Sequence, residues 1–241
     1  MRPWYTLLIG LRRATMNKHV SNDFDRIRNE HMAKGVILID PSHTYIENNV
    51  EIGEGTTMYP GCYIHSGTKI GTNCVLYPNV RIENSTIGDD VVIESSVVLD
   101  STIGTGTKIG PFAYIRPNSH IGENCRIGDF VEIKNSTIAD HTAVAHLTYV
   151  GDGDVGSHVN IGCGTVFVNY DGKIKQRTTV EDGAFIGCNS NLIAPVRIEK
   201  DAYIAAGSTV TQRVPPKALY IARARGVVKE NWVETRNKKE S

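Results

Sequence analysis

The stretch that decides the fold spans residues 121–133 and reads Ile121-Gly122-Glu123-Asn124-Cys125-Arg126-Ile127-Gly128-Asp129-Phe130-Val131-Glu132-Ile133. An aliphatic residue returns every six positions, and Gly directly follows the first two. Neither the ~3.6-residue turn of a helix nor the alternation of a lone strand accounts for this period. The stretch therefore predicts a β-solenoid, in which short strands form flat faces and the aliphatic residues stack inside.

The same period continues on both sides of this stretch. It runs unbroken from Ile46 to Ile82, resets by one residue at Ile87, resets again at Ile103, Ile138 and Val155, and is interrupted over 168–179. Because each coil of a solenoid packs against its neighbours, stability grows by stacking and both ends need caps. The predicted inward-facing residues are Ile46, Ile52, Met58, Ile64, Ile70, Leu76, Ile82, Ile87, Ile93, Leu99, Ile103, Ile109, Ile115, Ile121, Ile127, Ile133, Ile138, Val144, Val150, Val155, Ile161, Phe167, Val180, Ile186, Leu192, Ile198, Ile204 and Val210.

This pattern resembles the hexapeptide repeat of left-handed parallel β-helix proteins. The resemblance implies an all-β fold and supplies the left-handed sense, which the period alone does not set. A small residue often stands four places after the aliphatic one, where it would fit a tight corner. Cys62, Cys74 and Cys125 occupy this position, so we expect them to be packing residues.

We expect four segments along the chain. They are an N-terminal extension (1–21), a helix and cap (22–44), the left-handed β-helix domain (45–213) and a C-terminal tail (214–241). Asn22 or Asp23 is expected to cap the helix, and Gly35 to end it.

Composition narrows the class of protein. Lys and Arg total 26, as do Asp and Glu, so no basic surplus favours binding to nucleic acid or an anionic membrane. The apolar run over 4–11 is far shorter than the ~20 residues that span a bilayer. Five scattered cysteines without a Cys-x-x-Cys pair favour reduced thiols and a cytoplasmic location.

Chemically versatile residues gather between residues 144 and 175. His146 lies two places after the inward Val144, so its side chain is expected to point outward. The insertion that carries Asn169 and Tyr170 interrupts the period, and loops on a rigid scaffold often carry function. We therefore predict a site on this part of the wall, formed by His146, Tyr149, Asn160, Asn169, Tyr170 and Lys175.

A family resemblance rests on these motifs. They are His146-Leu147-Thr148-Tyr149-Val150-Gly151-Asp152, Asn160-Ile161-Gly162, Asn169-Tyr170-Asp171-Gly172 and Ala194-Pro195-Val196. They resemble the C-terminal acetyltransferase half of the bacterial bifunctional N-acetylglucosamine-1-phosphate uridyltransferase/glucosamine-1-phosphate N-acetyltransferase. The resemblance covers residues 22–233, and nothing in residues 1–50 resembles the Gly-rich loop of the uridyltransferase half. We therefore expect acetyl transfer without uridyl transfer.

The resemblance implies acetylation of glucosamine-1-phosphate by acetyl-CoA, in the pathway to UDP-N-acetylglucosamine and cell-wall precursors. It makes His146 the general base, supported by Glu132. An ordinary His titrates near ~6.5 and suits this task. The implied acceptor contacts are Arg116, Lys134, Tyr149, Asn160, Asn169, Tyr170 and Lys175, in which the cations would hold the phosphate. The implied acetyl-CoA contacts are the backbone N–H of Cys163, then Asn169, Tyr170, Cys188, Ala206 and Arg223.

The resemblance also implies a homotrimer in which neighbouring chains complete one another's sites, with no metal. The two thiols of Cys163 and Cys188 raise an acyl-cysteine route, which we do not expect because Cys163 is implied to act through its backbone.

Three alternatives remain at this stage. The acceptor could be galactosamine-1-phosphate or another amino-sugar phosphate, since one hydroxyl separates the sugars. His120, His141 and His146 could bind zinc as in carbonic anhydrases of this fold, but they fall at different phases of the repeat. The solenoid could also be a non-catalytic scaffold, which would leave the grouping of His146 with Arg116 and Lys134 without a reason.

Overall fold

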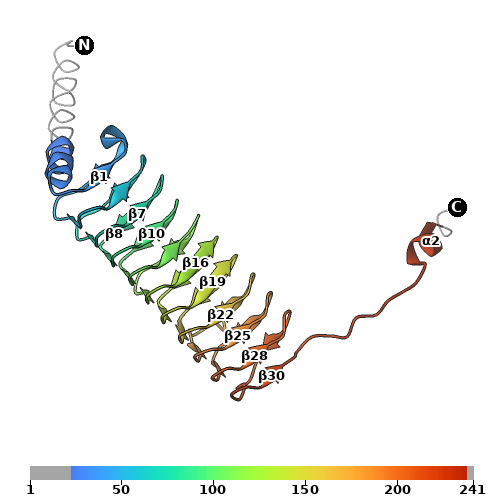
Figure 1. Cartoon of the computed structure of the whole chain (residues 1–241). Helices are drawn as coiled ribbons and strands as arrows, with labels where there is room; N and C mark the ends of the chain where they lie inside the picture. Colours follow the sequence, from blue (N-terminus) through green and yellow to red (C-terminus); the bar gives the residue numbers. More distant parts are fainter. Residues whose placement is uncertain (1–22, 238–241) are drawn as a thin grey trace, which may run out of the picture.

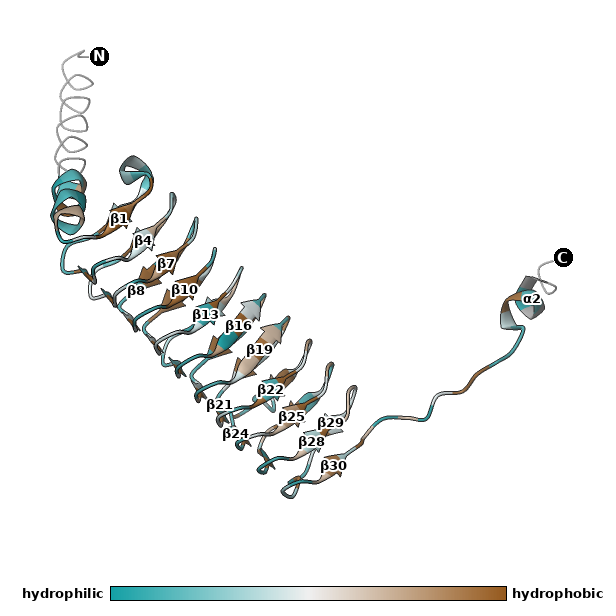
Figure 2. Ribbon diagram, in the orientation of Figure 1, coloured by the Kyte–Doolittle hydropathy of each residue, from teal (hydrophilic) through white to brown (hydrophobic). Residues whose placement is uncertain are grey.

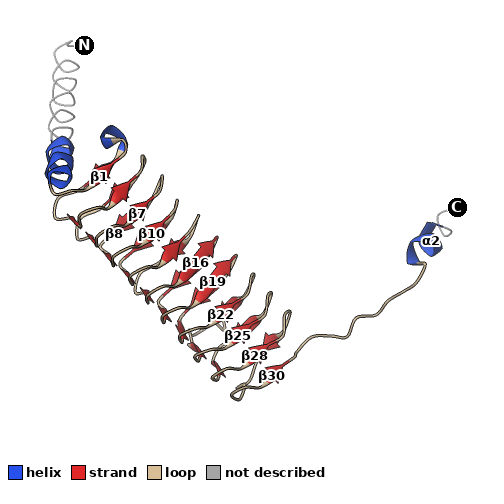
Figure 3. Ribbon diagram, viewed as in Figure 1, coloured by secondary structure: helices blue, strands red, loops and turns tan. Residues whose placement is uncertain are grey.

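The computed structural model describes residues 23–237 and shows a solenoid of stacked coils (Figure 1). The predicted extension over 1–21 and the candidate cap Asn22 lie outside the described residues. Each complete coil contributes one short strand to each of three parallel sheets, which we call the first, second and third faces (Figure 3). The chain passes from the first face to the second and then to the third.

The first face, among the described residues, is an 11-stranded sheet. Its strands are β1 (Ile37–Leu38), β4 (Thr57–Met58), β7 (Val75–Leu76), β10 (Val92–Ile93), β13 (Lys108–Ile109), β16 (Arg126–Asp129), β19 (Ala143–His146), β22 (Asn160–Ile161), β25 (Phe185–Ile186), β28 (Tyr203–Ile204) and β30 (Leu219–Tyr220).

The second and third faces have 10 and 9 strands within the same part of the chain. The second face consists of β2 (Tyr45–Ile46), β5 (Tyr63–Ile64), β8 (Arg81–Glu83), β11 (Val97–Leu99), β14 (Tyr114–Ile115), β17 (Glu132–Lys134), β20 (Tyr149–Gly151), β23 (Val166–Val168), β26 (Asn191–Ile193) and β29 (Thr209–Val210). The third consists of β3 (Glu51–Ile52), β6 (Lys69–Ile70), β9 (Thr86–Ile87), β12 (Thr102–Ile103), β15 (His120–Ile121), β18 (Thr137–Ile138), β21 (Gly153–Val155), β24 (Thr178–Val180) and β27 (Val196–Ile198).

The core confirms the predicted solenoid. Every predicted inward residue except Leu99 is buried, with at most 8% of its surface exposed. Register explains the burial, because like positions pair between coils, as Ile127 does with Val144. In Figure 2 the strands β1, β7 and β10 are mainly brown (hydrophobic), whereas β16 is partly teal (hydrophilic).

The prediction for Leu99 is wrong by one residue. Val98 is fully buried and Leu99 is half-buried, because β11 pairs Val98 with Ile82 in β8 and with Ile115 in β14. Successive side chains of a strand point to opposite sides, so this register turns Leu99 outward.

The corners hold small residues, and Cys62, Cys74 and Cys125 are buried there as predicted. At one corner the Thr107 hydroxyl donates to the Gly122 carbonyl (2.8 Å) and accepts the Cys125 N–H (2.9 Å). Bonds of this kind let the chain turn sharply without leaving buried backbone groups unpaired.

A helix over residues 23–33 covers the first coil. Ile27 is buried in the core, and Arg28 Nη1 donates to the carbonyl of Thr44 (3.0 Å). The ring of Phe24 meets that of Tyr45 edge-on, with centroids 5.7 Å apart. This helix therefore caps the stack, followed by β1 and the short 3₁₀ helix η1 (Pro41–His43).

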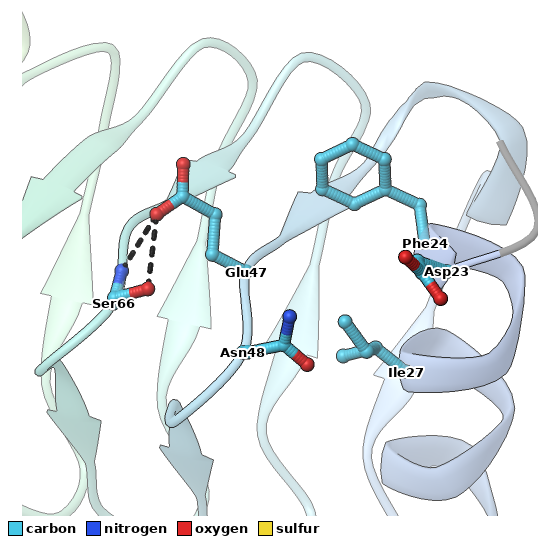
Figure 4. A pocket seen from close by; sticks show the side chains of 6 residues that line it. All are labelled: Asp23, Phe24, Ile27, Glu47, Asn48 and Ser66. Atoms are coloured by element: carbon cyan, nitrogen blue, oxygen red, sulfur yellow. Dashed lines mark hydrogen bonds between the residues drawn. The ribbon is translucent and has the colours of Figure 1, made fainter. Parts of the chain in front are cut away.

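The helix leaves a cavity of about 290 Å³ beside the first coils (Figure 4). Its lining is Asp23, Phe24, Ile27, Glu47, Asn48 and Ser66. The Glu47 carboxylate accepts hydrogen bonds from the N–H (3.0 Å) and hydroxyl (3.1 Å) of Ser66. None of the residues predicted for the site lines this cavity.

At the other end the chain leaves the solenoid after β30 and runs outward to α2 (Trp232–Asn237) (Figure 1). The solenoid takes in β1 and β30, which lie outside the predicted limits of 45–213. No helix in the described part of the chain is long and apolar enough to cross a membrane.

Candidate functional site

His146 ends β19, at the corner between the first and second faces. Its side chain is 58% exposed, and its Nδ1 contacts a carboxylate oxygen of Asp129, which ends the neighbouring strand β16. This hydrogen bond lowers the pKa of Asp129, so the carboxylate is ionised near neutral pH. The two residues share a cavity of about 380 Å³ that is open to solvent. The outward orientation predicted for His146 is therefore present.

Glu132 has a different partner from the one that the resemblance implied. Its carboxylate accepts a hydrogen bond from Arg116 Nη1 at 2.6 Å, and its Cα partner in β20 is Tyr149. In the structure, therefore, Asp129 contacts His146, and Glu132 contacts Arg116, which is a predicted phosphate ligand.

The predicted cations gather at the corner where the second face ends. Arg116, Lys134 and Lys175 line a cavity of about 580 Å³, together with Arg177. The neighbouring Lys175 ammonium lowers the pKa of Lys134, with partial burial adding to the effect. The two neighbouring positive charges repel each other, so a bound anion would reduce this repulsion.

Asp152 lies beneath these lysines and is 5% exposed. Its carboxylate accepts hydrogen bonds from the amides of Asn135 (2.5 Å) and Asn169, and Lys134 Nζ lies 3.9 Å away. Burial raises the pKa of Asp152, but the two amides and the charges of Lys134 and Lys175 together lower it below its ordinary value. Asp152 therefore places a buried, hydrogen-bonded negative charge next to the cation cluster.

The insertion between β23 and β24 delivers Lys175 to this cluster. The Asp171 carboxylate accepts the N–H groups of Lys173 and Ile174, both at 2.8 Å, which forms a tight turn. Tyr170 and Lys175 form an antiparallel bridge, so the chain doubles back to the corner it left. The hydrogen-bonded turn and the bridge therefore fix the position of Lys175 beside the other cations.

His146 and the predicted cations lie at opposite ends of the same strands. β17 and β20 run from the His146 corner to the Lys134 corner, and a three-residue strand is about 10 Å long. The Arg116 side chain reaches back along this face to Glu132. The second face therefore has an imidazole at one end of its strands and a cluster of cations at the other.

The implied acetyl-CoA residues form a column that starts at His146. Cys163, Cys188 and Ala206 occupy the same corner on the next three coils. The amide after Cys163 donates to the His146 carbonyl (3.3 Å), the amide after Cys188 to Cys163 (2.7 Å), and the amide after Ala206 to Cys188 (2.8 Å). Arg223 Nη1 donates to the Ala206 carbonyl at 2.7 Å and so lies at the end of this column.

Three predicted residues stand apart from these groups within one chain. Asn160 belongs to β22 on the first face, not to the second. Tyr170 is exposed, Asn169 is buried against Asp152, and both follow β23 at the corner opposite to Cys163. One chain alone therefore does not unite all the residues that the resemblance implied.

The three histidines considered for zinc are also dispersed. His120 lies in β15 on the third face and is hydrogen-bonded to Thr102 (2.8 Å), while His141 stacks on His158 with ring centroids 4.9 Å apart. In the part of the chain that the structure describes, no three His, Cys, Asp or Glu side chains are arranged to hold a metal.

Sequence reasoning missed Asp129 and Asp152. Asp129 precedes His146 by 17 residues, and Asp152 follows Asn135 by the same interval. One coil has about this length, so residues 17 positions apart lie next to each other on adjacent coils. A search of the sequence at this interval from His146 and Asn135 would have identified Asp129 and Asp152.

Comparisons with known proteins agree with this architecture. The family model described as bacterial transferase hexapeptide (six repeats) matches residues 100–135 and 177–212, and the GMPPB C-terminal domain model matches residues 46–116. The solved structure titled Arabidopsis UDP-N-acetylglucosamine acyltransferase superposes with a TM-score of 0.51 at 18% identity, covering 83% of this chain and 76% of that one. This likeness supports the fold, and the hexapeptide repeats make it a left-handed β-helix.

Curated relatives are closer in sequence. The bifunctional protein GlmU of Clostridium botulinum (strain Kyoto / Type A2) is 56% identical over 209 residues, which cover 87% of this chain and 46% of the relative. GlmU of Clostridioides difficile (strain 630) is 53% identical over 215 residues, with 89% and 47% covered. The chain spans about half the length of these relatives. It therefore belongs to the bacterial hexapeptide-repeat transferases, as the counterpart of the C-terminal half of GlmU.

Proposed function

We propose that this protein is an acetyl-CoA-dependent N-acetyltransferase that converts glucosamine-1-phosphate to N-acetylglucosamine-1-phosphate. The observation that carries the proposal is the placement of a solvent-facing His146 and a cluster of Arg116, Lys134 and Lys175 along one face. The similarity to GlmU supports the same assignment.

The proposed reaction begins with the amine of the bound sugar. His146 Nε2 takes a proton from the neutral amine nitrogen as it attacks the thioester carbonyl, because the nitrogen gains positive charge when the new C–N bond forms. The N–H of Cys163, one coil further at the same corner, would stabilise the developing oxyanion. Collapse of the intermediate breaks the C–S bond, and the proton on His146 passes to the departing CoA thiolate.

Acceptor selection follows from the cation cluster. A phosphate between Lys134 and Lys175 replaces a repulsive pair with charge-assisted hydrogen bonds, and Arg116 can add a planar fork. Amines without a phosphate would lose these bonds. The cluster thus favours an amino sugar that carries its phosphate close to the amine.

Assembly into a homotrimer completes the proposed site. Within one chain, Asn160 pairs with Ala143 at the start of β19, whereas His146 ends that strand, and Tyr170 follows β23 at the far corner of the second face. A neighbour that turns its first face towards this second face would supply Asn160.

The free thiols of all five cysteines and the use of acetyl-CoA suit the cytoplasm.

Release of the CoA thiol from acetyl-CoA tests the reaction directly. Glucosamine-1-phosphate, galactosamine-1-phosphate and glucosamine serve as acceptors. We expect the first to be preferred and glucosamine to lose roughly 100-fold or more in kcat/KM, since several charge-assisted bonds disappear. A preference for the galacto sugar would keep the mechanism and change the acceptor. No release with any acceptor would overturn the proposal and favour a scaffold.

Mixed oligomers test the shared site. His146→Ala and Asn160→Ala chains are each expected to be impaired, but in mixed trimers some sites combine an intact His146 from one chain with an intact Asn160 from its neighbour. Activity above the sum of the separate variants is expected. A mixture that shows only that sum would mean that each chain builds its site alone.

A further inference from the structure

We propose that Asp129 is the positioning residue for His146, which it orients through Nδ1; this inference rests on the proposed function. The contact is made across neighbouring strands, since Asp129 in β16 and His146 in β19 are Cα partners. Neither the sequence motifs nor the family resemblance pointed to this aspartate. The resemblance implied Glu132 as the supporting residue, but the Glu132 carboxylate accepts a hydrogen bond from Arg116.

The backbone holds the two residues in a fixed relation. Ile127 and Val144 are paired and buried immediately before them, and the N–H of Leu147 donates to the Asp129 carbonyl at 3.0 Å. Gly128 permits the close approach, because a Cβ there would overlap the Ala145 carbonyl oxygen. The contact is therefore set by packed strands on both sides of it.

Other charged groups near His146 do not replace this partner. Glu94, Lys108 and Arg126 line the same cavity, but the hydrogen bond that reaches the imidazole from within the described residues comes from Asp129. From the following coil, the thiol-bearing Cys163 approaches the same corner.

The chemical consequence is a defined tautomer. An ionised carboxylate at Nδ1 places the ring proton on Nδ1 and leaves the lone pair of Nε2 free to face the amine. When Nε2 accepts the proton of the amine, the same carboxylate stabilises the imidazolium and remains ionised itself. Asp129 thus sets which nitrogen acts and makes its protonation easier.

Asp129→Asn tests the role, because Asn keeps the size but not the charge. We expect kcat to fall roughly 10- to 1000-fold, which is less than the ~10²- to 10⁴-fold contributed by general base catalysis as a whole, because His146 itself is kept. The acidic limb of the kcat/KM profile should move to lower pH by about one unit, because a neighbouring anion favours the imidazolium. KM for the acceptor should change little. Asp140→Asn is the matched control, since Asp140 receives the Glu123 N–H (2.8 Å) at a corner away from His146.

A readout independent of activity separates this inference from the proposed function. Nitrogen NMR of the His146 ring should show the proton on Nδ1 in the wild type and a mixed tautomer in Asp129→Asn. If the wild type releases no CoA but shows this tautomer change, the acetyltransferase proposal fails and the pairing stands. If Asp129→Asn keeps the wild-type kcat, pH profile and tautomer in an active enzyme, the inference is overturned.

Discussion

Glu132 and Arg116 form an ion pair on the second face, with 2.6 Å between Oε1 and Nη1. Arg116 is thereby held over the strand that leads from the cation cluster to His146. The family resemblance had joined Glu132 to His146, whereas Glu132 contacts the proposed phosphate ligand Arg116 and Asp129 contacts the proposed base His146.

Glu132→Gln therefore should act on acceptor binding. Both partners are more than a third exposed, and exposed ion pairs contribute about 0–1 kcal/mol, so KM for the sugar phosphate should rise up to roughly fivefold. The acidic limb of the pH profile should stay in place. Steady-state kinetics beside Asp129→Asn makes the comparison. A 100-fold fall in kcat at constant KM would instead mean that Glu132 acts on His146.

Removing either lysine of the cluster should weaken acceptor binding. Lys134→Gln or Lys175→Gln is expected to raise KM for glucosamine-1-phosphate roughly 10- to 100-fold, since hydrogen bonds to charged groups contribute about 1.5–3 kcal/mol. Because Lys175 lowers the pKa of Lys134, Lys175→Gln should also extend the protonated range of Lys134 to higher pH. Initial rates against acceptor concentration, at neutral and alkaline pH, measure both effects.

Lys69→Gln is the control for these variants, because Lys69 pairs with Glu51 (2.9 Å) on the third face. It should leave KM unchanged. An equal effect of all three substitutions would show that general surface charge, not the cluster, attracts the acceptor.

Asp152 should make the fold sensitive to acid. Its folded pKa lies below the ordinary value of ~3.9, so its carboxylate contributes stability above about pH 4 and loses it as pH falls through the folded pKa. Asp152→Asn should lower the melting temperature at pH 7 and lower it less at pH 3. Thermal unfolding followed by circular dichroism at both values measures this. An equal loss at both would mean that the charge of Asp152 does not stabilise the protein.

The register at β11 gives a test of packing. Val98→Ala removes two fully buried methyl groups and should destabilise the protein by about 2 kcal/mol. Leu99→Ala removes a larger but half-buried side chain and should cost less. Thermal or urea unfolding of the two variants compares them. The reverse order would restore the inward position predicted for Leu99.

The sequence was sufficient for the solenoid because one inward residue per six specifies the faces. It was insufficient at Val97, Val98 and Leu99, where consecutive aliphatic residues satisfy the period equally well. Pairing with Ile82 and Ile115 on the adjacent coils decides among them, and that is a property of the stack.

The site, like the fold, was predictable from the sequence only in part. Arg116 and Lys134 are neighbours one coil apart, but Lys175 joins them through loop closure, which the family resemblance implied and spacing did not. Asp129 and Glu132 are two carboxylates three residues apart, and only the one-coil interval of 17 residues distinguishes Asp129 as the neighbour of His146. The structure decides, because a corner separates them.

The proposed mechanism depends most on His146 as the general base, and the His146→Ala variant tests this most directly. CoA release with glucosamine-1-phosphate should fall in kcat by roughly 10²- to 10⁴-fold, with KM for the acceptor within about threefold. His158→Ala, which removes an exposed histidine stacked on His141, should behave as the wild type. A His146→Ala protein that keeps the wild-type kcat would contradict the proposed mechanism.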